Sequence, residues 1–321
     1  MAIGNTLRKK TILVTGGAGF IGSWMCARLL ELGARVVCVD DLSTGKRENV
    51  AHCKQYGTFF IFVRANVNSR KALAAVFSKY KPQYVLHYAA FLGVRRTLEN
   101  PFKVLADIEG IKNIHELSRK HNVTKVLFSS SSEVYGELNG TTAVENKTPI
   151  NSRLPYAAVK VLGEIYFRTY YEEYGLPTVS LRFFNVYGPR QESSAYGFVT
   201  AIFMRQALSG KPLTVFGKGM QTRDFVYIKD NIEATLKALT NPKIKGEEIN
   251  IGTGKETRII DLAKKIVKLS GKSSKIKFLP PLKKGDMLGR CPDITKMKRL
   301  LKYQPRYTLD RGLRETYEEI G

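Results

Sequence analysis

The first half of the chain alternates short apolar segments with longer segments in which apolar residues recur every three or four positions. Short apolar runs bounded by turn residues predict buried β-strands, and the longer pattern predicts amphipathic helices. We expect strands at Thr11–Val14, Arg35–Asp40, Phe59–Val63, Tyr84–His87, Lys125–Ser129 and Thr178–Arg182, and helices that include Trp24–Leu32 and residues 156–174. Strands that alternate with helices form a parallel sheet covered on both faces. The pattern therefore predicts a doubly wound α/β fold.

The pattern loosens after the last of these strands, where glycine and proline pairs interrupt it at 188–189, 217–219 and 280–281. Such residues mark turns and loops. We expect two lobes, with residues 1–177 forming the doubly wound domain and residues 178–321 a smaller C-terminal α/β lobe. Later segments can return to the first lobe, so the two can interleave.

Composition narrows the possible classes of protein. No segment reaches the roughly 18 apolar residues of a membrane span, and the N-terminal residues contain no cleavage-like signal, so we expect a cytoplasmic protein without membrane contact. The four cysteines include no CxxC pair and the four histidines are far apart, which excludes the usual metal-site spacings. Cys26 and Cys38 fall in a helix and a strand pattern, as small buried hydrophobes do.

The formal net charge of +24 raises the question of a polyanionic partner. The basic residues are spread along the chain, and the densest runs fall on helix-like or loop patterns that are typical of solvated faces. We therefore do not expect nucleic-acid binding. A positive field would also attract a small polyanion such as a sugar diphosphate.

A glycine-rich turn follows the first strand in the segment TGGAGFIGS, at residues 15–23. A helix pattern and a second strand come next, and that strand ends in Asp40. This order is the fingerprint of a Rossmann-type dinucleotide site, in which glycines let the backbone approach a pyrophosphate and the acid accepts hydrogen bonds from the adenosine ribose. Asp40 would repel a 2′-phosphate and so favours NAD, although Lys46 and Arg47 leave NADP open.

A second group of polar residues consists of two segments. One is YAAVK at residues 156–160, and the other is the run of serines at residues 129–132, where the strand expected at Lys125–Ser129 ends. Four residues apart on a helix, Tyr156 and Lys160 share a face. An ammonium beside a phenol favours the phenolate, so Tyr156 is a candidate base that removes a hydroxyl proton while hydride leaves the same carbon. Ser131 is the best candidate to relay or hold that proton.

Together TGGAGFIGS, SSSSEVYG, YAAVK, RFFNVYGPR and QTRDFVYIKD resemble the extended short-chain dehydrogenase/reductase family of nucleotide-sugar epimerases and dehydratases. The resemblance covers nearly the whole chain and is greatest to UDP-glucose 4-epimerases, with UDP-glucuronate decarboxylases and sugar 4,6-dehydratases as near relatives. It implies a tightly bound NAD that is recycled within each turnover and a UDP-sugar substrate. It also implies a homodimer formed through the helices near 100–120 and 156–174.

The resemblance assigns roles to individual residues. The catalytic residues are Ser131, Tyr156 and Lys160. The residues that bind NAD are Gly16, Gly19, Phe20, Ile21, Gly22, Asp40, Asn66, Val67 and Ala89, together with Tyr156 and Lys160. The residues that bind the sugar nucleotide are Ser131, Ser132, Glu133, Asn185, Arg223, Lys283 and Arg290. No residue is assigned to a metal.

Several positions depart from the family pattern. Asn66 stands where an acid often contacts the adenine, Asp107 replaces the usual asparagine near the nicotinamide, and Lys283 replaces a second diphosphate arginine. Arg290 puts a charge where epimerases set the size of the sugar pocket, which resembles the decarboxylases. Glu192 stands where uronate epimerases tend to have arginine, which favours a neutral hexose.

These residues leave four functions open. The leading hypothesis is NAD-dependent epimerisation at C4 of a UDP-hexose through a transient 4-keto sugar. Decarboxylation of a UDP-uronic acid and 4,6-dehydration share that keto step, and decarboxylases and some dehydratases also carry the Ser132-Glu133 pair. A non-catalytic NAD-binding regulator is the remote alternative, and the intact set of Ser131, Tyr156, Lys160 and Arg223 argues against it.

Overall fold

A seven-stranded parallel sheet forms the centre of the computed structural model, which describes residues 3–92, 94–138, 140–151, 154–194, 197–272, 274–281 and 288–321. The strand order is β12-β7-β5-β4-β1-β2-β3. The strands are β1 (Thr11–Thr15), β2 (Arg35–Asp40), β3 (Phe60–Arg64), β4 (Tyr84–His87), β5 (Lys125–Ser131), β7 (Thr178–Phe183) and β12 (Glu247–Ile251). This sheet confirms the doubly wound Rossmann-type fold.

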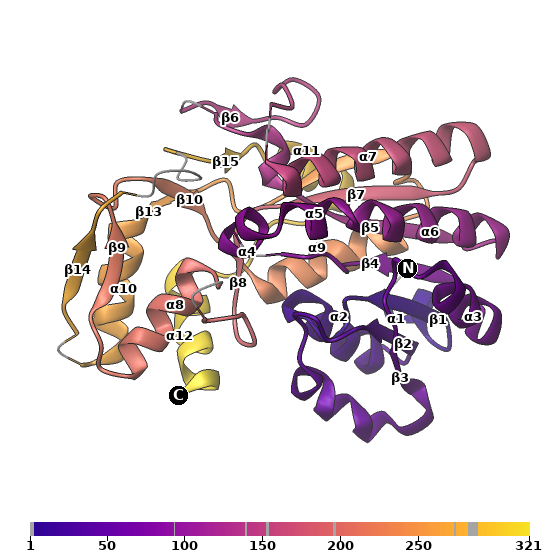
Figure 1. Ribbon diagram of the computed structural model, residues 1–321, viewed down its shortest axis with the longest axis horizontal. Helices are drawn as coiled ribbons and strands as arrows, with labels where there is room; N and C mark the ends of the chain where they lie inside the picture. Colours follow the sequence, from indigo (N-terminus) through magenta and orange to yellow (C-terminus); the bar gives the residue numbers. More distant parts are fainter. Residues whose placement is uncertain are drawn as a thin grey trace.

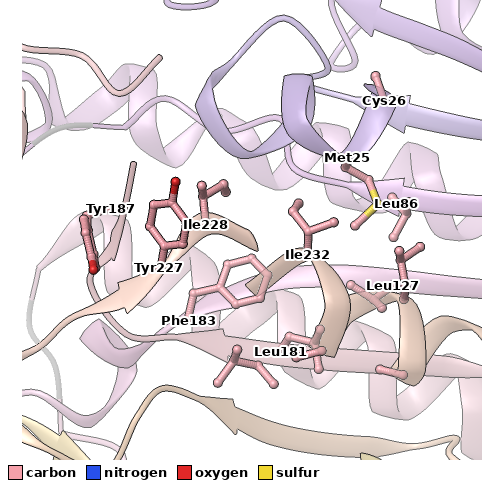
Figure 2. Packing of buried hydrophobic residues seen from close by; sticks show 14 of the residues in the cluster. Met25, Cys26, Leu86, Leu127, Leu181, Phe183, Tyr187, Tyr227, Ile228 and Ile232 are labelled. Carbon is pink, nitrogen blue, oxygen red and sulfur yellow. The ribbon is translucent and has the colours of Figure 1, made fainter. Parts of the chain in front are cut away.

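Helices cover both faces of the sheet (Figure 1). One face packs against α1 (Ile3–Leu7), α2 (Phe20–Glu31) and α9 (Ile228–Thr240), and the other against α3 (Arg70–Tyr80), α6 (Asp107–Lys120) and α7 (Pro155–Tyr174). On the first face, Met25 and Ile232 from the helices meet Leu86, Leu127 and Leu181 from three adjacent strands (Figure 2). Burial of this apolar surface is the main force that holds helices and sheet together.

A smaller group of elements lies beyond the end of the sheet, on the left of Figure 1. It contains α8 (Val199–Leu208), α10 (Ile259–Ser270) and α12 (Leu309–Ile320), with β9 (Leu213–Phe216) paired to β14 (Ile276–Leu279) and β10 (Thr222–Asp224) paired to β13 (Glu256–Arg258). The remaining elements are η1 (Arg47–Phe59), α4 (Val94–Glu99), α5 (Pro101–Leu105), η2 (Ser132–Tyr135), β6 (Thr142–Ala143), β8 (Val186–Tyr187), β11 (Val226–Tyr227), β15 (Cys291–Pro292) and α11 (Thr295–Leu301).

Strands from the second half of the chain complete the central sheet. Both β7 and β12 come after residue 177, and they pair with each other in parallel, while β7 also pairs with β5. The chain therefore passes between the sheet and the smaller group more than once. The division of the chain into lobes at residues 177 and 178 stays a prediction.

The strand boundaries expected from the hydrophobic pattern agree with the structure within one or two residues. The helix expected at Trp24 begins earlier, at Phe20, because it starts directly at the glycine turn with Gly19 as its N-cap. Gly22 therefore lies in the first helical turn and is buried there. Within the part of the chain that the structure describes, no helix combines the length and the apolar character needed to cross a membrane.

Candidate active site

A cavity of about 730 Å³ opens at the carboxyl ends of the central strands. The order of the strands reverses at β1, which lies between β2 and β4, and ligands of such sheets bind in the crevice at this switch point. Residues that follow β1, β2, β4 and β5 line the cavity, as does the first turn of α7. The topology thus brings together motifs that are far apart in the sequence.

The glycine turn lets backbone approach backbone closely. Gly16 has a φ of +65°, and a Cβ atom there would lie 2.6 Å from the backbone nitrogen of Ala89. A Cβ atom at Gly22 would lie 2.2 Å from the carbonyl oxygen of Gly16. Side chains at these positions would push the turn away from β4, and with it the start of α2. The first turn of α2 lines the cavity, so its amides and dipole favour an anionic group there.

Asp40 ends β2 at the far side of this turn and lines the cavity, although only 7% of it is exposed. Its carboxylate accepts hydrogen bonds from the amides of Ala18, at 2.9 Å, and Leu42, at 2.8 Å. Burial raises the pKa of Asp40, and these amide bonds oppose that shift. Each carboxylate oxygen can accept a further bond, so the residue fits the two hydroxyls of a ribose.

Two other residues of this region are fixed by neighbours. The Asn66 amide donates to Asp41 at 3.1 Å and its oxygen accepts from the amide of Asn68, so the side chain that replaces the family acid is held at the cavity wall. The Arg47 guanidinium lies 4.5 Å from the centre of the Phe62 ring. Asp40 therefore carries the negative charge at the ribose end, as NAD rather than NADP requires.

The catalytic candidates meet where β5 ends and α7 begins. The Lys160 ammonium is buried, donates to the carbonyl of Ser129 at 2.6 Å and lies 5.5 Å from the centre of the Tyr156 ring. Ser131 caps η2 by accepting from the amide of Glu133 at 3.2 Å, and it also hydrogen-bonds Tyr156. The residues that the sequence assigns to proton transfer thus share one wall of the cavity.

Burial opposes the charged forms of both catalytic groups. It raises the pKa of Tyr156, while the hydrogen bond with Ser131 acts in the opposite direction. It lowers the pKa of Lys160 to about 8, and the charges of Asp107 and Glu164 oppose that shift. An ammonium at Lys160 favours the phenolate form of Tyr156, so the pair can accept and return a proton as long as the lysine remains charged.

Two ion pairs lie near the sugar-binding end. The Arg290 guanidinium is 3% exposed and contacts both carboxylate oxygens of Glu133, at 2.5 and 3.2 Å. The same guanidinium reaches Ser132 at 3.4 Å. Arg96, on α4, donates to both oxygens of Glu192 at 3.1 and 2.9 Å. Each arginine is thus neutralised by a carboxylate.

The structure places most, but not all, of the predicted site residues at the cavity. Every residue expected to bind NAD lines it, as do Ser131, Ser132, Glu133 and Asn185 of the sugar-binding set. Arg223 lies on β10 outside the lining and donates to the carbonyl of Thr222 at 2.7 Å, while Arg290 is buried behind Glu133. Lys283 lies outside the described residues. The roles of all these residues stay predictions.

The cavity lining also includes residues that sequence reasoning did not select. Four of them are basic, namely Lys46, Arg96, Lys103 and Arg190. Arg190 is the last residue of the RFFNVYGPR segment, so the sequence motif already contained it. Arg96 and Lys103 lie on short helices after β4, where no motif marks them. Arg96 and Lys103 can be recognised as candidate site residues only from the fold, which brings α4 and α5 to the cavity.

Comparison with known proteins agrees with this geometry. The family model described as the NAD dependent epimerase/dehydratase family matches residues 12–252. The chain belongs to this family. It is 36% identical over 308 residues to a UDP-glucose 4-epimerase of Mycolicibacterium smegmatis, covering 95% of this chain and 97% of that relative. It is 35% identical over 320 residues to a UDP-N-acetyl-alpha-D-glucosaminuronate decarboxylase of Bacillus cytotoxicus, covering 97% of each.

A solved structure is also similar over the whole chain. The UDP-glucose 4-epimerase of Thermotoga maritima with UDP-glucose has a TM-score of 0.91 and 35% identity, and the match covers 97% of this chain and 98% of that one. The protein is therefore an enzyme of an NAD-dependent family. The glycine turn that a Cβ would fill, together with Asp40, fits this cofactor. Among the residues that the structure describes, no group of three or more His, Cys, Asp or Glu side chains could hold a metal ion.

Proposed function

We propose that the enzyme interconverts UDP-hexoses, UDP-glucose with UDP-galactose or their N-acetyl forms, by epimerisation at C4 through a transient 4-keto sugar. The observation that carries the proposal is the convergence of Tyr156, Lys160 and Ser131 on the cavity that contains the glycine turn. Gly16, Gly22 and Asp40 would hold NAD, which would supply reversible hydride acceptance when bound. No metal and no second substrate are needed for this chemistry.

The protein side chains move one proton in each direction. Tyr156 takes the proton of the sugar 4-hydroxyl as the hydride leaves C4, and Ser131 holds the hydroxyl oxygen by a hydrogen bond. Lys160 stabilises the phenolate form of Tyr156 from its site 5.5 Å from the ring centre. For reduction on the other face of the 4-keto sugar, Tyr156 would return the proton to the sugar oxygen.

A neutral sugar suits the charges at the sugar-binding end. Uronate recognition needs a cation for the substrate carboxylate, and the guanidinium groups of Arg290 and Arg96 already contact Glu133 and Glu192. Asn185, whose amide donates to the carbonyl of Asp224 at 2.9 Å, and Arg223 on the neighbouring strand β10 are the proposed diphosphate contacts. UDP as the nucleotide is supported by the relatives that act on UDP-sugars.

Decarboxylation of a UDP-uronic acid is the second candidate, and one observation favours it. Ser132, Glu133 and Arg290 lie in mutual contact at the cavity wall, and decarboxylases resemble this chain at all three positions. The Bacillus cytotoxicus relative is named a decarboxylase. Dehydration is less favoured, because a serine stands at position 132 where 4,6-dehydratases place an acid that protonates the leaving hydroxyl.

Product analysis distinguishes these reactions. The purified enzyme is incubated separately with UDP-glucose, UDP-N-acetylglucosamine and UDP-glucuronate, and the products are identified by mass spectrometry and NMR. We expect the C4 epimer of a neutral hexose with unchanged mass, formed about 10²–10⁴-fold more slowly by Tyr156→Phe as the control. Release of carbon dioxide from UDP-glucuronate, or a stable 4-keto-6-deoxy product, would overturn the epimerase proposal.

We infer that the enzyme is a homodimer that pairs through α5 and α7. Four large apolar side chains are exposed on these helices, with exposed fractions of 83% for Phe102, 41% for Leu105, 44% for Leu162 and 53% for Ile165. Leu162 and Ile165 are three residues apart on α7 and therefore share a face. The family resemblance places the second copy on the helices near 100–120, which are α5 and α6, and on α7.

Leu162→Glu should convert the dimer to a monomer, because it places a charge in the centre of an apolar interface. Size-exclusion chromatography with light scattering measures the change. Phe278→Glu is the matched control, since Phe278 is 56% exposed on β14 in the smaller group of elements. A wild-type monomer, or a Leu162→Glu protein that stays dimeric, would contradict the inferred interface.

A further inference from the structure

The Lys160 ammonium lies over the ring of Phe128, 4.6 Å from the ring centre, while the centre of the Tyr156 ring is 5.5 Å away. Phe128 is on β5 and is fully buried. It directly precedes Ser129, whose carbonyl accepts the hydrogen bond from Lys160 at 2.6 Å. The face of an aromatic ring attracts a cation that lies within about 6 Å of the ring centre. Lys160 therefore meets β5 through a carbonyl and an aromatic face.

Packing fixes the Phe128 ring in this position. It stacks on Phe167 from α7, with ring centres 4.8 Å apart, and on His87 from β4, with ring centres 5.9 Å apart. Helix α7 comes close to the ring at Gly163, where a Cβ atom would lie 2.5 Å from two of the ring carbons. Gly163 is about one turn after Lys160. Because it has no side chain, the ring can lie against the turn of the helix that carries the lysine.

The titratable groups around Lys160 show why a neutral contact matters. Burial opposes the charge of Lys160, and Glu164, one turn along α7, is already held in a buried ion pair. His87, from β4, is neutral because burial lowers its pKa to about 3. The carboxylate of Asp107, at the start of α6, raises the pKa of Lys160 against burial but adds to burial in raising that of Tyr156. A carboxylate therefore opposes the phenolate, whereas a neutral ring adds no net charge.

We propose that Phe128 is a positioning residue that holds the Lys160 ammonium by a cation–π contact and keeps it charged beside Tyr156. This inference rests on the proposed function, in which Tyr156 is the base. The proton passes between the sugar hydroxyl and the Tyr156 oxygen, and Lys160 keeps its own proton. Without the attraction of the ring, a buried ammonium loses its proton at a lower pH and no longer stabilises the phenolate.

Fluorination of the Phe128 ring tests the contact, because fluorine withdraws electron density from the ring face and changes the size of the ring little. In separate proteins, 3,4,5-trifluorophenylalanine and 4-fluorophenylalanine are incorporated at position 128. NMR of the NAD-bound enzyme, labelled with ¹³C at the lysine Cε carbon, follows the titration of Lys160, whose signal is assigned by its absence in Lys160→Met. We expect the trifluoro ring to lower the proton affinity of Lys160 about tenfold, the scale of one pKa unit, and the single fluorine to lower it less.

The matched control carries the trifluoro ring at position 167. Phe167 is also buried and stacks on Phe128, but it lies about two turns along α7 from Lys160. The Lys160 titration of this protein should match wild type. An unchanged Lys160 titration with the trifluoro ring at position 128, or an equal shift from both positions, would overturn the role of Phe128. If the trifluoro ring at position 128 prevents folding, the milder 4-fluoro ring decides by the same criteria.

The pH dependence of kcat separates this role from a purely structural one. Burial lowers the pKa of Lys160 to about 8, so below about pH 6 the lysine is charged with or without fluorine on the ring. The two enzymes should have equal kcat there, and the fluorinated enzyme should lose activity at a lower pH than wild type on the alkaline side. A loss of equal size at every pH would contradict the proposal. The NMR result needs no turnover, so this proposal and the epimerase proposal fail separately.

Discussion

Tyr156→Phe should lower kcat by about 10²–10⁴-fold, the usual contribution of a general base, while NAD and UDP-sugar binding remain close to wild type. The substitution removes one oxygen and keeps the ring, which packs beside the core formed by α6, α7 and the sheet. The lost contact is the hydrogen bond with Ser131. A single bond of this kind contributes about 1 kcal/mol to stability, so the fold should be preserved.

The measurement compares kcat, KM and bound NAD for the variant and for a matched control. Tyr166→Phe is suitable, because Tyr166 lies on the same helix but packs against His115, away from the cavity lining. The control should retain wild-type turnover. A Tyr156→Phe enzyme with wild-type kcat would remove the proton-transfer role from this residue, and loss of NAD from the variant would point to a structural cause.

Local patterns in the sequence predicted six of the seven strands of the central sheet and the residues at the glycine turn that line the cavity. Strands such as Arg35–Asp40 are continuous apolar runs, and the glycine turn connects a strand to a helix that begins within it. The four-residue spacing of Tyr156 and Lys160 placed both on one helical face. Each of these features depends on residues that are close in sequence. Their spacing is therefore enough to predict the local structure.

Pairings between distant residues could not be predicted in the same way. Arg290 reaches Glu133 across 157 positions, and Arg96 reaches Glu192 across 96. An isolated arginine in a sequence has no preferred partner, and the partner appears only when β5, α4 and the later loops converge. The sequence therefore indicated that Arg290 was unusual. Only the structure identifies Glu133 as the carboxylate that neutralises it.

The predicted strands also missed β12, the last strand of the sheet. Its residues Glu247–Ile251 begin with two acids, so the segment does not resemble the apolar strands of the first half. Glu248 is nevertheless buried, with only 5% of its surface exposed. Its charge is compensated by Arg168 from α7, at 2.6 Å. An edge strand whose charge is compensated by a neighbouring helix has no simple hydrophobic pattern, which explains why it was not expected.

Arg182→Met should lower the free energy of unfolding by about 3–5 kcal/mol, the cost of leaving a buried charge without its partner. Arg182, on β7, is 1% exposed and contacts both oxygens of Glu164 on α7, at 2.8 Å each. It also donates to the hydroxyl of Tyr135 at 2.8 Å, and Tyr135 in turn donates to Asn250 on β12 at 2.7 Å. One guanidinium thus connects α7, η2 and two strands.

Urea denaturation of matched variants measures the effect. Arg168→Met is the comparison, since Arg168 lies on the same helix α7 and pairs with Glu248 but has a half-exposed side chain. Because the Glu248 side chain itself is only 7% exposed, we expect a loss above the about 0–1 kcal/mol of an exposed pair and below the loss in Arg182→Met. The double variant Arg182→Met/Glu164→Leu should recover part of the loss, because the carboxylate that was left unpaired is also removed. Equal costs for Arg182→Met and Arg168→Met would contradict the argument. Because η2 carries Ser132 and Glu133 beside Tyr135, the Arg182 variant should also lower kcat while Arg168→Met leaves it unchanged.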